Sequence, residues 1–281
     1  MYSSTAWETR EVVSTRITPL RLECFEQLPK HARRCVFWEV DPSALGRDEQ
    51  FADPEFEKEA WLSMVMLEWG SCGQIAVPLS PRRPGGDEGS DLTYPPAQTQ
   101  HEQLDAPCVG YAIYAPPHAV PRARCFPTAP VSPDAVLLTS MGIEPGHADT
   151  LPRQLISQAV ADLVRRGVRS LEAFGRTAEA EELVDARTVP YEVGPVVEPF
   201  GDCSFDQCMI EAEFLQDVGF TVVAPHRYFP RLRLELNHGL GWKAEVEAAL
   251  ERLLQSAQLQ PVGVGAESNS LAGESARNLS G

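Results

Sequence analysis

The sequence predicts an α/β fold of the α+β type, with a central mixed, mostly antiparallel sheet flanked by helices. Residues 135–143 form an apolar run typical of a buried strand, residues 151–166 carry an apolar stripe at helical spacing, and residues 168–174 form the next strand. A short crossover through one helix makes these two strands parallel and adjacent. Residues 231–236 alternate charged and apolar side chains, as an antiparallel strand does.

The other elements follow from apolar patterns bounded by turn residues. Pro29 interrupts the first helix, Asp149 or Thr150 caps the helix at 151–166, and Gly167 and Gly219 end the helices before them. The remaining predicted strands span residues 17–22, 73–79, 108–115 and 220–224, and the remaining predicted helices span residues 23–35, 55–69, 205–218 and 242–256.

These elements predict one main domain, at residues 16–258, with an extension at 1–15 before it. Residues 80–107 and 176–201 are rich in Pro, Gly and acidic residues, so we expect a disordered insertion and a long loop. Residues 259–281 have little to bury and are expected to form a disordered tail. The last helix is either a cap on the sheet or a homodimer contact.

Composition limits the partners of the chain. A net charge of −16 argues against binding to nucleic acid or to anionic membranes. The seven cysteines are irregularly spaced, which favours reduced thiols in the cytoplasm over a disulfide framework. We expect a cytoplasmic protein, with no secretory signal at its start and no apolar run long enough to span a membrane.

The segment at 135–156 carries the strongest functional signal. A buried strand runs into a short polar loop and then into the first turn of a helix. This arrangement points free backbone N–H groups and the positive end of a helix dipole at one place. Such a place favours a phosphate or pyrophosphate group.

Two motifs give the chain a resemblance to the GNAT family of acyl-CoA N-acyltransferases. The first is Ser140-Met-Gly-Ile-Glu-Pro145 followed by Leu151-Pro-Arg-Gln-Leu-Ile156, which is similar to the family's fourth strand, pyrophosphate loop and helix. The second is Phe214-Leu-Gln-Asp-Val-Gly-Phe220, which looks like the family's Tyr-x-x-x-Gly-Phe segment. The resemblance covers roughly residues 16–236.

The resemblance implies an N-acetyltransferase that moves an acetyl group from acetyl-CoA to the amine of a small molecule or peptide by direct attack. The fourth and fifth strands would splay apart, and the backbone of Met141, Gly142 and Ile143 would pair with the pantetheine arm. The pyrophosphate would lie on the loop and first helical turn, with Arg153 adding a charge. The other residues implied there are His147, Asp149, Thr150, Leu151 and Pro152.

Two departures from the family pattern leave an alternative open. The loop Gly146-His-Ala-Asp-Thr-Leu-Pro-Arg153 lacks the family's basic residue and both of its glycines, and Pro152 has no N–H to donate. Leu215 stands where the family often has a tyrosine acid. The alternative is a non-catalytic GNAT-like domain that binds an acyl-CoA or a protein partner.

Glu172, on the fifth strand, is the candidate general base, against the alternative of an outward-facing charge. Cys203 and Cys208 are more simply small buried side chains than catalytic thiols. A zinc site from these two thiols with His226 and His238 matches no tight spacing, so the sequence predicts no metal.

Three further positions leave a binding role open. Tyr111, Tyr114 and His118 lie at the end of the third strand and either line an acceptor pocket or pack on the sheet. Glu39 either recognises an amine or lies on the surface.

Overall fold

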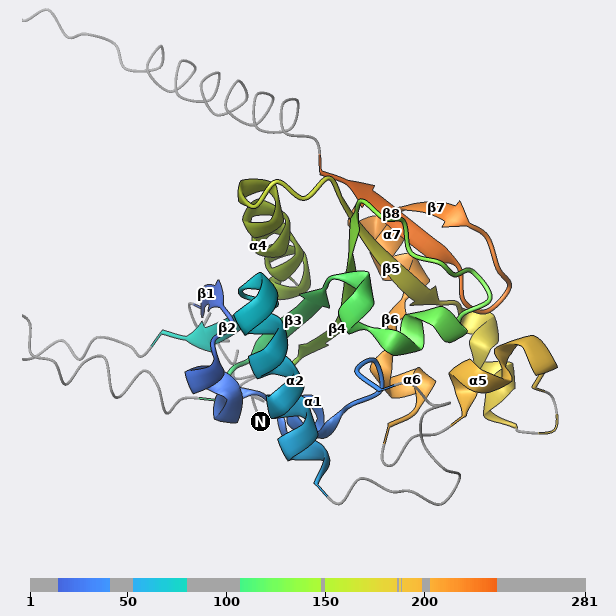
Figure 1. Cartoon of the computed structure of the whole chain (residues 1–281), viewed down its shortest axis with the longest axis horizontal. Coiled ribbons are helices and arrows are strands. Elements are labelled where there is room, and N and C mark those ends of the chain that lie inside the picture. Colours follow the sequence, from blue (N-terminus) through green and yellow to red (C-terminus); the bar gives the residue numbers. More distant parts are fainter. Residues whose placement is uncertain are drawn as a thin grey trace, which may run out of the picture. The chain divides into compact units, whose positions relative to one another are not determined.

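The computed structural model describes residues 15–40, 53–79, 107–147, 150–185, 187, 189–198 and 203–236 (Figure 1). One sheet runs through this part of the chain in the order β1-β2-β3-β4-β5-β8-β7, and the two-residue strand β6 pairs with β5 beside this path. The strands are β1 (Thr15–Pro19), β2 (Gly73–Pro78), β3 (Gly110–Ala115), β4 (Ala135–Ile143), β5 (Ser170–Arg176), β6 (Ile210–Glu211), β7 (Thr221–Ala224) and β8 (Arg231–Glu235). The helices are α1 (Lys30–Arg34), α2 (Pro54–Trp69), α4 (Leu151–Arg165), α5 (Gly194–Val197), α6 (Phe205–Cys208) and α7 (Ala212–Asp217).

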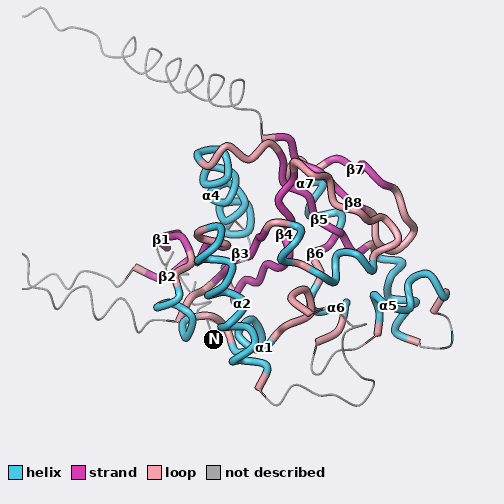
Figure 2. Tube along the Cα trace, viewed as in Figure 1, coloured by secondary structure: helices cyan, strands magenta, loops and turns pink. Residues whose placement is uncertain are grey.

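Helices cover both faces of the sheet (Figure 2). The central strands bury their side chains on both faces, so each face needs a covering layer. On β3, Tyr111 and Ile113 point into a core shared with α2 and the segment before α1. Ala112 and Tyr114 point to the opposite face, where α4 and α7 pack. The apolar residues of α4 that enter this second core recur at helical spacing: Leu151, Leu155, Ile156, Ala159 and Leu163.

Most of the predicted elements are present, and the structure differs from the prediction in two segments. The single helix expected at 205–218 is instead α6, then β6, then α7, because Ile210 and Glu211 pair with the end of β5. The loop expected at 176–201 contains two 3-10 helices, Ala178–Val184 and Tyr191–Val193, and the short helix α5. The insertion at 80–107 lies almost wholly outside the described residues, and the helix at 242–256 and the tail at 259–281 lie wholly outside them.

The expected splay between the fourth and fifth strands is present. β4 and β5 are parallel, but only Ala135–Leu137 of β4 pair with Ser170–Glu172 of β5. Beyond these three pairs β4 continues to Ile143 along β3, and β5 continues to Arg176 along β8 and β6. The N–H groups of Gly175 and Thr177 donate to the segment just before β8, so β6 lies on the other edge of β5, on the β4 side of the opening.

A glycine on β4 lets an aromatic ring lie across the strand beside the splay. Gly142 faces Tyr111 of β3 directly. A Cβ atom on Gly142 would lie 2.4 Å from Cε1 of Tyr111 and 2.9 Å from its hydroxyl oxygen. The Tyr111 ring therefore covers the backbone of β4, in space that any other residue at position 142 would fill.

We expect Gly142→Ala to lower the free energy of unfolding by about 1–3 kcal/mol, since the added methyl group overpacks the buried Tyr111 ring. Gly194→Ala is the comparison variant, because a Cβ there meets no atom within 4 Å apart from its chain neighbours. Gly194 is helical and precedes Pro195, which disfavours a side chain there, so this change should cost less than about 1 kcal/mol. Urea denaturation of both variants measures the difference. Equal effects at the two positions would show that Tyr111 does not occupy this space.

Candidate acyl-CoA site

The backbone of β4 presents hydrogen-bonding groups to the splay. The Glu144 N–H donates to Val109 O at 2.9 Å, on the β3 side. Successive residues of a strand point their backbone groups to alternate edges, so Gly142 also faces β3, and Met141 and Ile143 face the opening. All three of these β4 residues are half-buried. The structure thus places the predicted residues 141–143 at the splay, with two of them turned toward it.

The loop after β4 is a tight turn that leads to the first turn of α4. The His147 N–H donates to Glu144 O at 3.3 Å, and Gly146 between them has a φ of +97°, which favours glycine. Thr150 is the N-cap of α4 but makes no side-chain cap hydrogen bond, and Pro152 occupies the first turn. Asp149, the other expected cap, lies outside the described residues. Leu151 is buried in the core under the sheet.

Arg153 does not point freely into this loop. Its guanidinium donates to the backbone oxygen of Asp217 at 2.8 Å, at the end of α7. The side chain of Arg153 remains 59% exposed, so solvent can reach it. It links the first turn of α4 to α7, the two helices on one face of the sheet.

Glu172 is buried and ion-paired, which argues against the predicted role of general base. Its side chain is fully buried and forms ion pairs with Arg231 at 2.5 Å and Arg233 at 3.0 Å, both from β8. It also accepts a hydrogen bond from the Ser132 N–H at 3.1 Å. Burial raises the pKa of a carboxyl group, but here the hydrogen bonds from Ser132 and the two arginines outweigh it and lower the pKa of Glu172. Glu172 also stands at the last β4–β5 pair, opposite Leu137, so it anchors the base of the splay.

Tyr111, Tyr114 and His118, predicted at the end of the third strand, lie in three different environments. Tyr111 lies against Gly142 at the splay. The Tyr114 hydroxyl, on the opposite face of the sheet, accepts a hydrogen bond from Gln74 and donates to Asp162. His118 is exposed, 3.9 Å from a carboxylate oxygen of Glu68. Only Tyr111 is placed for a role at the splay.

Leu215, at the position where the family often has its tyrosine acid, is fully buried on α7. It packs among the apolar residues between the sheet and the helices α4 and α7. The apolar surroundings of Leu215 agree with the expectation that this position supplies no proton to a leaving group.

Glu39 is buried, contrary to its interpretation as a surface charge. One of its oxygens pairs with Nζ of Lys58 at 2.5 Å, and both side chains are at most 3% exposed. Its other oxygen, Oε2, has no hydrogen-bond partner within the described residues. Burial raises the pKa of Glu39 although Lys58 acts against it. The negative charge of Glu39 also contributes to the raised pKa of Tyr111. The sequence pattern does not reveal Lys58, which lies on the buried face of α2 with Trp61, Leu62 and Val65.

A cluster of sulfur and nitrogen atoms lies on the face of the sheet that carries α1 and α2. Sγ of Cys35 is 3.4 Å from Sγ of Cys208, which is 3.7 Å from Nε2 of His31. The neighbouring thiols of Cys208 and Cys35 lower the pKa of Cys203. His226 is not part of this group, since its Nδ1 accepts from the backbone N–H groups of residues 228 and 229. His238 lies outside the described residues.

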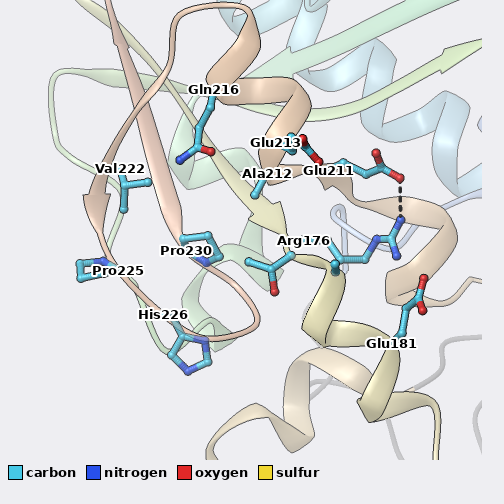
Figure 3. Close-up of a pocket in the computed structure, with 12 residues that line it drawn as sticks. Arg176, Glu181, Glu211, Ala212, Glu213, Gln216, Val222, Pro225, His226 and Pro230 are labelled. Carbon is cyan, nitrogen blue, oxygen red and sulfur yellow. Dashed lines mark hydrogen bonds and ion pairs between the residues drawn. The ribbon is translucent and has the colours of Figure 1, made fainter.

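A separate pocket of about 580 Å³ lies where the end of β5 meets β6, α7 and the β7–β8 hairpin. Its charged lining includes Glu181, Glu211 and Glu213, and Arg176 pairs with Glu211 at 3.3 Å (Figure 3). No residue of β4 or α4 lines it. It is therefore distinct from the edge of β4 that the resemblance assigns to the pantetheine arm.

No family model matches the chain, and no curated protein matches it. Its strand order, its parallel β4–β5 pair and the splay beyond that pair are those expected of the GNAT acetyltransferase fold. The chain has a GNAT fold.

Three solved structures illustrate the likeness. A GNAT-family structure from Desulfovibrio desulfuricans is 15% identical, with a TM-score of 0.36, over 80% of this chain and 100% of that one. PaiA N-acetyltransferase from Thermoplasma acidophilum, in complex with coenzyme A, is 11% identical, with a TM-score of 0.38, over 79% of this chain and 99% of that one. The ribosomal-protein-S18-alanine N-acetyltransferase from Escherichia coli is 10% identical, with a TM-score of 0.34, over 80% of this chain and 95% of that one. These TM-scores are too low to carry an argument. The fold assignment therefore depends on the strand order and the splay of this chain.

Within the described part of the chain, none of the helices combines the length and the apolar character that crossing a membrane requires.

We expect Glu172→Gln to lower the free energy of unfolding by about 3 kcal/mol, because it removes one partner from a buried ion-pair network. Glu235→Gln is the matched control: Glu235 also pairs with Arg233, but its side chain is 58% exposed. That change should cost less than about 1 kcal/mol. Urea denaturation at neutral pH measures both. Equal costs would contradict the anchoring role of Glu172.

The pKa shift of Glu172 also predicts acid sensitivity. A lowered folded-state pKa contributes stability above the unfolded value of about 4.5, and this stability is lost as pH falls through the folded value. The free energy of unfolding should therefore decline below about pH 4.5 less steeply in Glu172→Gln than in the unchanged protein. Parallel pH profiles of the two proteins would contradict this.

Proposed function

We propose that the chain is an acyl-CoA-dependent N-acyltransferase that uses acetyl-CoA and transfers the acetyl group to an amine by direct attack. The observation that carries the proposal is the splay. Beyond the pair Leu137–Glu172, a strand edge with backbone groups of Met141 and Ile143 turned toward it borders an opening in the middle of the sheet. A polar arm with amide groups, such as pantetheine, can pair with this edge as an extra strand does.

The diphosphate end of the donor is proposed to bind at the first turn of α4, which directly follows β4. The N-terminus of this 15-residue helix favours negative charge. Pro152 removes one N–H donor there, and Arg153 is held by Asp217. Loss of a charge-assisted hydrogen bond costs about 1.5–3 kcal/mol, so we expect weak donor binding, about tenfold to a hundredfold weaker than with a complete loop.

Tyr111 is proposed to protonate the leaving thiolate. Leu215 lacks a proton to give, whereas the Tyr111 hydroxyl lies across Gly142, on the strand that would hold the arm. Its raised pKa, caused first by burial, keeps it protonated at neutral pH, which is the form that an acid requires.

Glu39 is proposed to receive the proton of the attacking amine in place of Glu172. It keeps one carboxylate oxygen unpartnered within the described residues, and its charge is electrostatically coupled to Tyr111. Lys58 pairs with the other oxygen of Glu39, yet burial still raises the pKa of Glu39, so Glu39 accepts a proton more readily than Glu172, whose pKa Ser132 and two arginines lower.

A second candidate function is a non-catalytic domain that binds an acyl-CoA. The proline in the first turn of α4 and the buried Leu215 favour it. The two functions differ in one measurement, because only the enzyme releases free coenzyme A in the presence of an amine.

Isothermal titration with acetyl-CoA is expected to show binding, which Met141→Pro should weaken by about tenfold or more, since it removes an N–H that faces the splay. Val223→Pro, on the exposed strand β7, is the control for a proline in a strand. Circular dichroism confirms that both variants fold. Equal affinity of the folded Met141→Pro variant would place the donor elsewhere, and no heat at millimolar acetyl-CoA would contradict the proposed function.

Tyr111→Phe should lower kcat by about 100-fold with little change in acetyl-CoA affinity, which is the usual contribution of a general acid. Tyr114→Phe is the matched control, since its hydroxyl lies on the opposite face and bonds Gln74 and Asp162. A panel of small amines and peptide N-termini, with released thiol as the readout, supplies the rates. Equal kcat values for the two variants would remove Tyr111 from the role of acid.

A further inference from the structure

Three residues from distant parts of the chain bring metal-ligating atoms together on the α1 face of the sheet, and a fourth residue, Cys203, has its thiol near them. His31 and Cys35 are four residues apart, on helix α1 and just after it, so their side chains share one face. Cys203 and Cys208 flank helix α6. The one histidine nitrogen and the sulfurs of Cys35 and Cys208 all lie within 4.8 Å of one another.

The spacing of these atoms suits a tetrahedral ion. With Zn–S bonds of about 2.3 Å and Zn–N bonds of about 2.0–2.1 Å, two sulfurs are about 3.8 Å apart and a sulfur and a nitrogen about 3.6 Å apart. The structure has 3.4 Å between the sulfurs of Cys35 and Cys208, and 3.7 Å between Cys208 Sγ and His31 Nε2. The third distance, between the ligand atoms of Cys35 and His31, is at most 4.8 Å, so tetrahedral geometry requires small shifts of these side chains.

Cys203 is the candidate for the fourth ligand. Its buried thiol is close enough to Cys208 and Cys35 for both to affect its pKa, but it lies outside the set of three ligand atoms within 4.8 Å, so its side chain has to move toward them to bind the ion. Three thiols and one imidazole form a Cys3His set, the donor set typical of structural zinc and unsuited to calcium or magnesium.

The surroundings hold these atoms in place. The three cysteines are at most 6% exposed, whereas His31 is exposed and leaves a path for an ion from solvent. The Trp38 indole donates to the backbone oxygen of Cys208 at 3.1 Å and fixes the end of α6. The other free cysteines within the described residues, including the buried Cys72 and Cys108, do not join the cluster.

We propose that His31, Cys35, Cys203 and Cys208 form a structural Zn²⁺ site. The ion joins α1 to the segment of α6 and β6. Because β6 pairs with β5 on the β4 side of the splay, the ion holds one wall of the opening. None of its ligands has a chemical role in the proposed acyl transfer, so zinc binding can be tested separately from activity.

Metal analysis of the full chain, purified under reducing conditions without chelators and then loaded with Zn²⁺ alone, tests the site. We expect about one zinc per chain. Loading with Co²⁺ should give the visible bands of tetrahedral cobalt and the near-ultraviolet charge-transfer band of cobalt–thiolate bonds. Loss of Cys35 or Cys208, in Cys35→Ser or Cys208→Ser, should weaken zinc binding by more than about 100-fold in competition with a chelator.

Cys108→Ser is the matched control, since Cys108 is buried at 2% exposure but lies outside the cluster. It should bind zinc as the unchanged protein does. If the cluster variants fail to fold, His31→Asn changes an exposed position, and its cobalt spectrum should show the loss of a nitrogen ligand. Alkylation followed by mass spectrometry should show that zinc protects Cys35, Cys203 and Cys208.

Either of two results overturns the site. The first is that the unchanged protein takes up neither zinc nor cobalt. This result overturns the site whether or not Cys35 and Cys208 are found joined by a disulfide. The second is zinc that remains bound, with the same affinity, in a folded Cys35→Ser or Cys208→Ser variant.

Discussion

The short parallel contact between β4 and β5 is the constraint on which the rest of the site depends. The two strands pair over Ala135–Leu137 and Ser170–Glu172 and then separate. Glu172 fixes the last pair, because its buried carboxylate ties β5 to Arg231 and Arg233 of β8 and to the loop before β4. An ion-pair network at the base of the opening holds β5 against β8 while β4 follows β3.

Other groups of the site are arranged around this opening. Tyr111 reaches across β4 because residue 142 has no side chain. Phe174, on the diverging part of β5, stacks on Phe126 at 4.2 Å and also lies against Trp38. Trp38 in turn bonds the end of α6, next to the thiols, and the following residue is Glu39. Aromatic packing thus connects the splay with the acidic and sulfur-containing groups on the α1 face.

The sequence predicts the elements whose patterns are local and misses the contacts that are not. The strand at 135–143 and the helix at 151–165 follow from apolar runs and spacing, and both are present. Residues 205–218 have enough helical character to predict one helix, but Ile210 and Glu211 gain more by pairing with β5, a contact that no local pattern contains. The sequence suggests a catalytic role for Glu172 because its strand gives no sign that two arginines 59 and 61 residues later face it.

The thiol cluster is a second case in which contacts between distant residues cannot be read from local sequence patterns. The i, i+4 spacing of His31 and Cys35 is a usable signal, but their partners are more than 160 residues away, and residue types alone suggest His226 and His238 as partners of Cys203 and Cys208. In the structure His226 caps its own turn through two backbone N–H groups. Ligand sets assembled across a fold require the topology as well as the residue types.

The central claim is that the open edge of β4 binds the arm of acetyl-CoA, and amide hydrogen exchange at single-residue resolution tests it most directly. The amides of Met141 and Ile143 face the opening, whereas that of Gly142 faces β3. At saturating acetyl-CoA, exchange at 141 or 143 should slow markedly, with a much smaller change at 142. Unchanged exchange at both 141 and 143, with the ligand shown to be bound, would contradict the account.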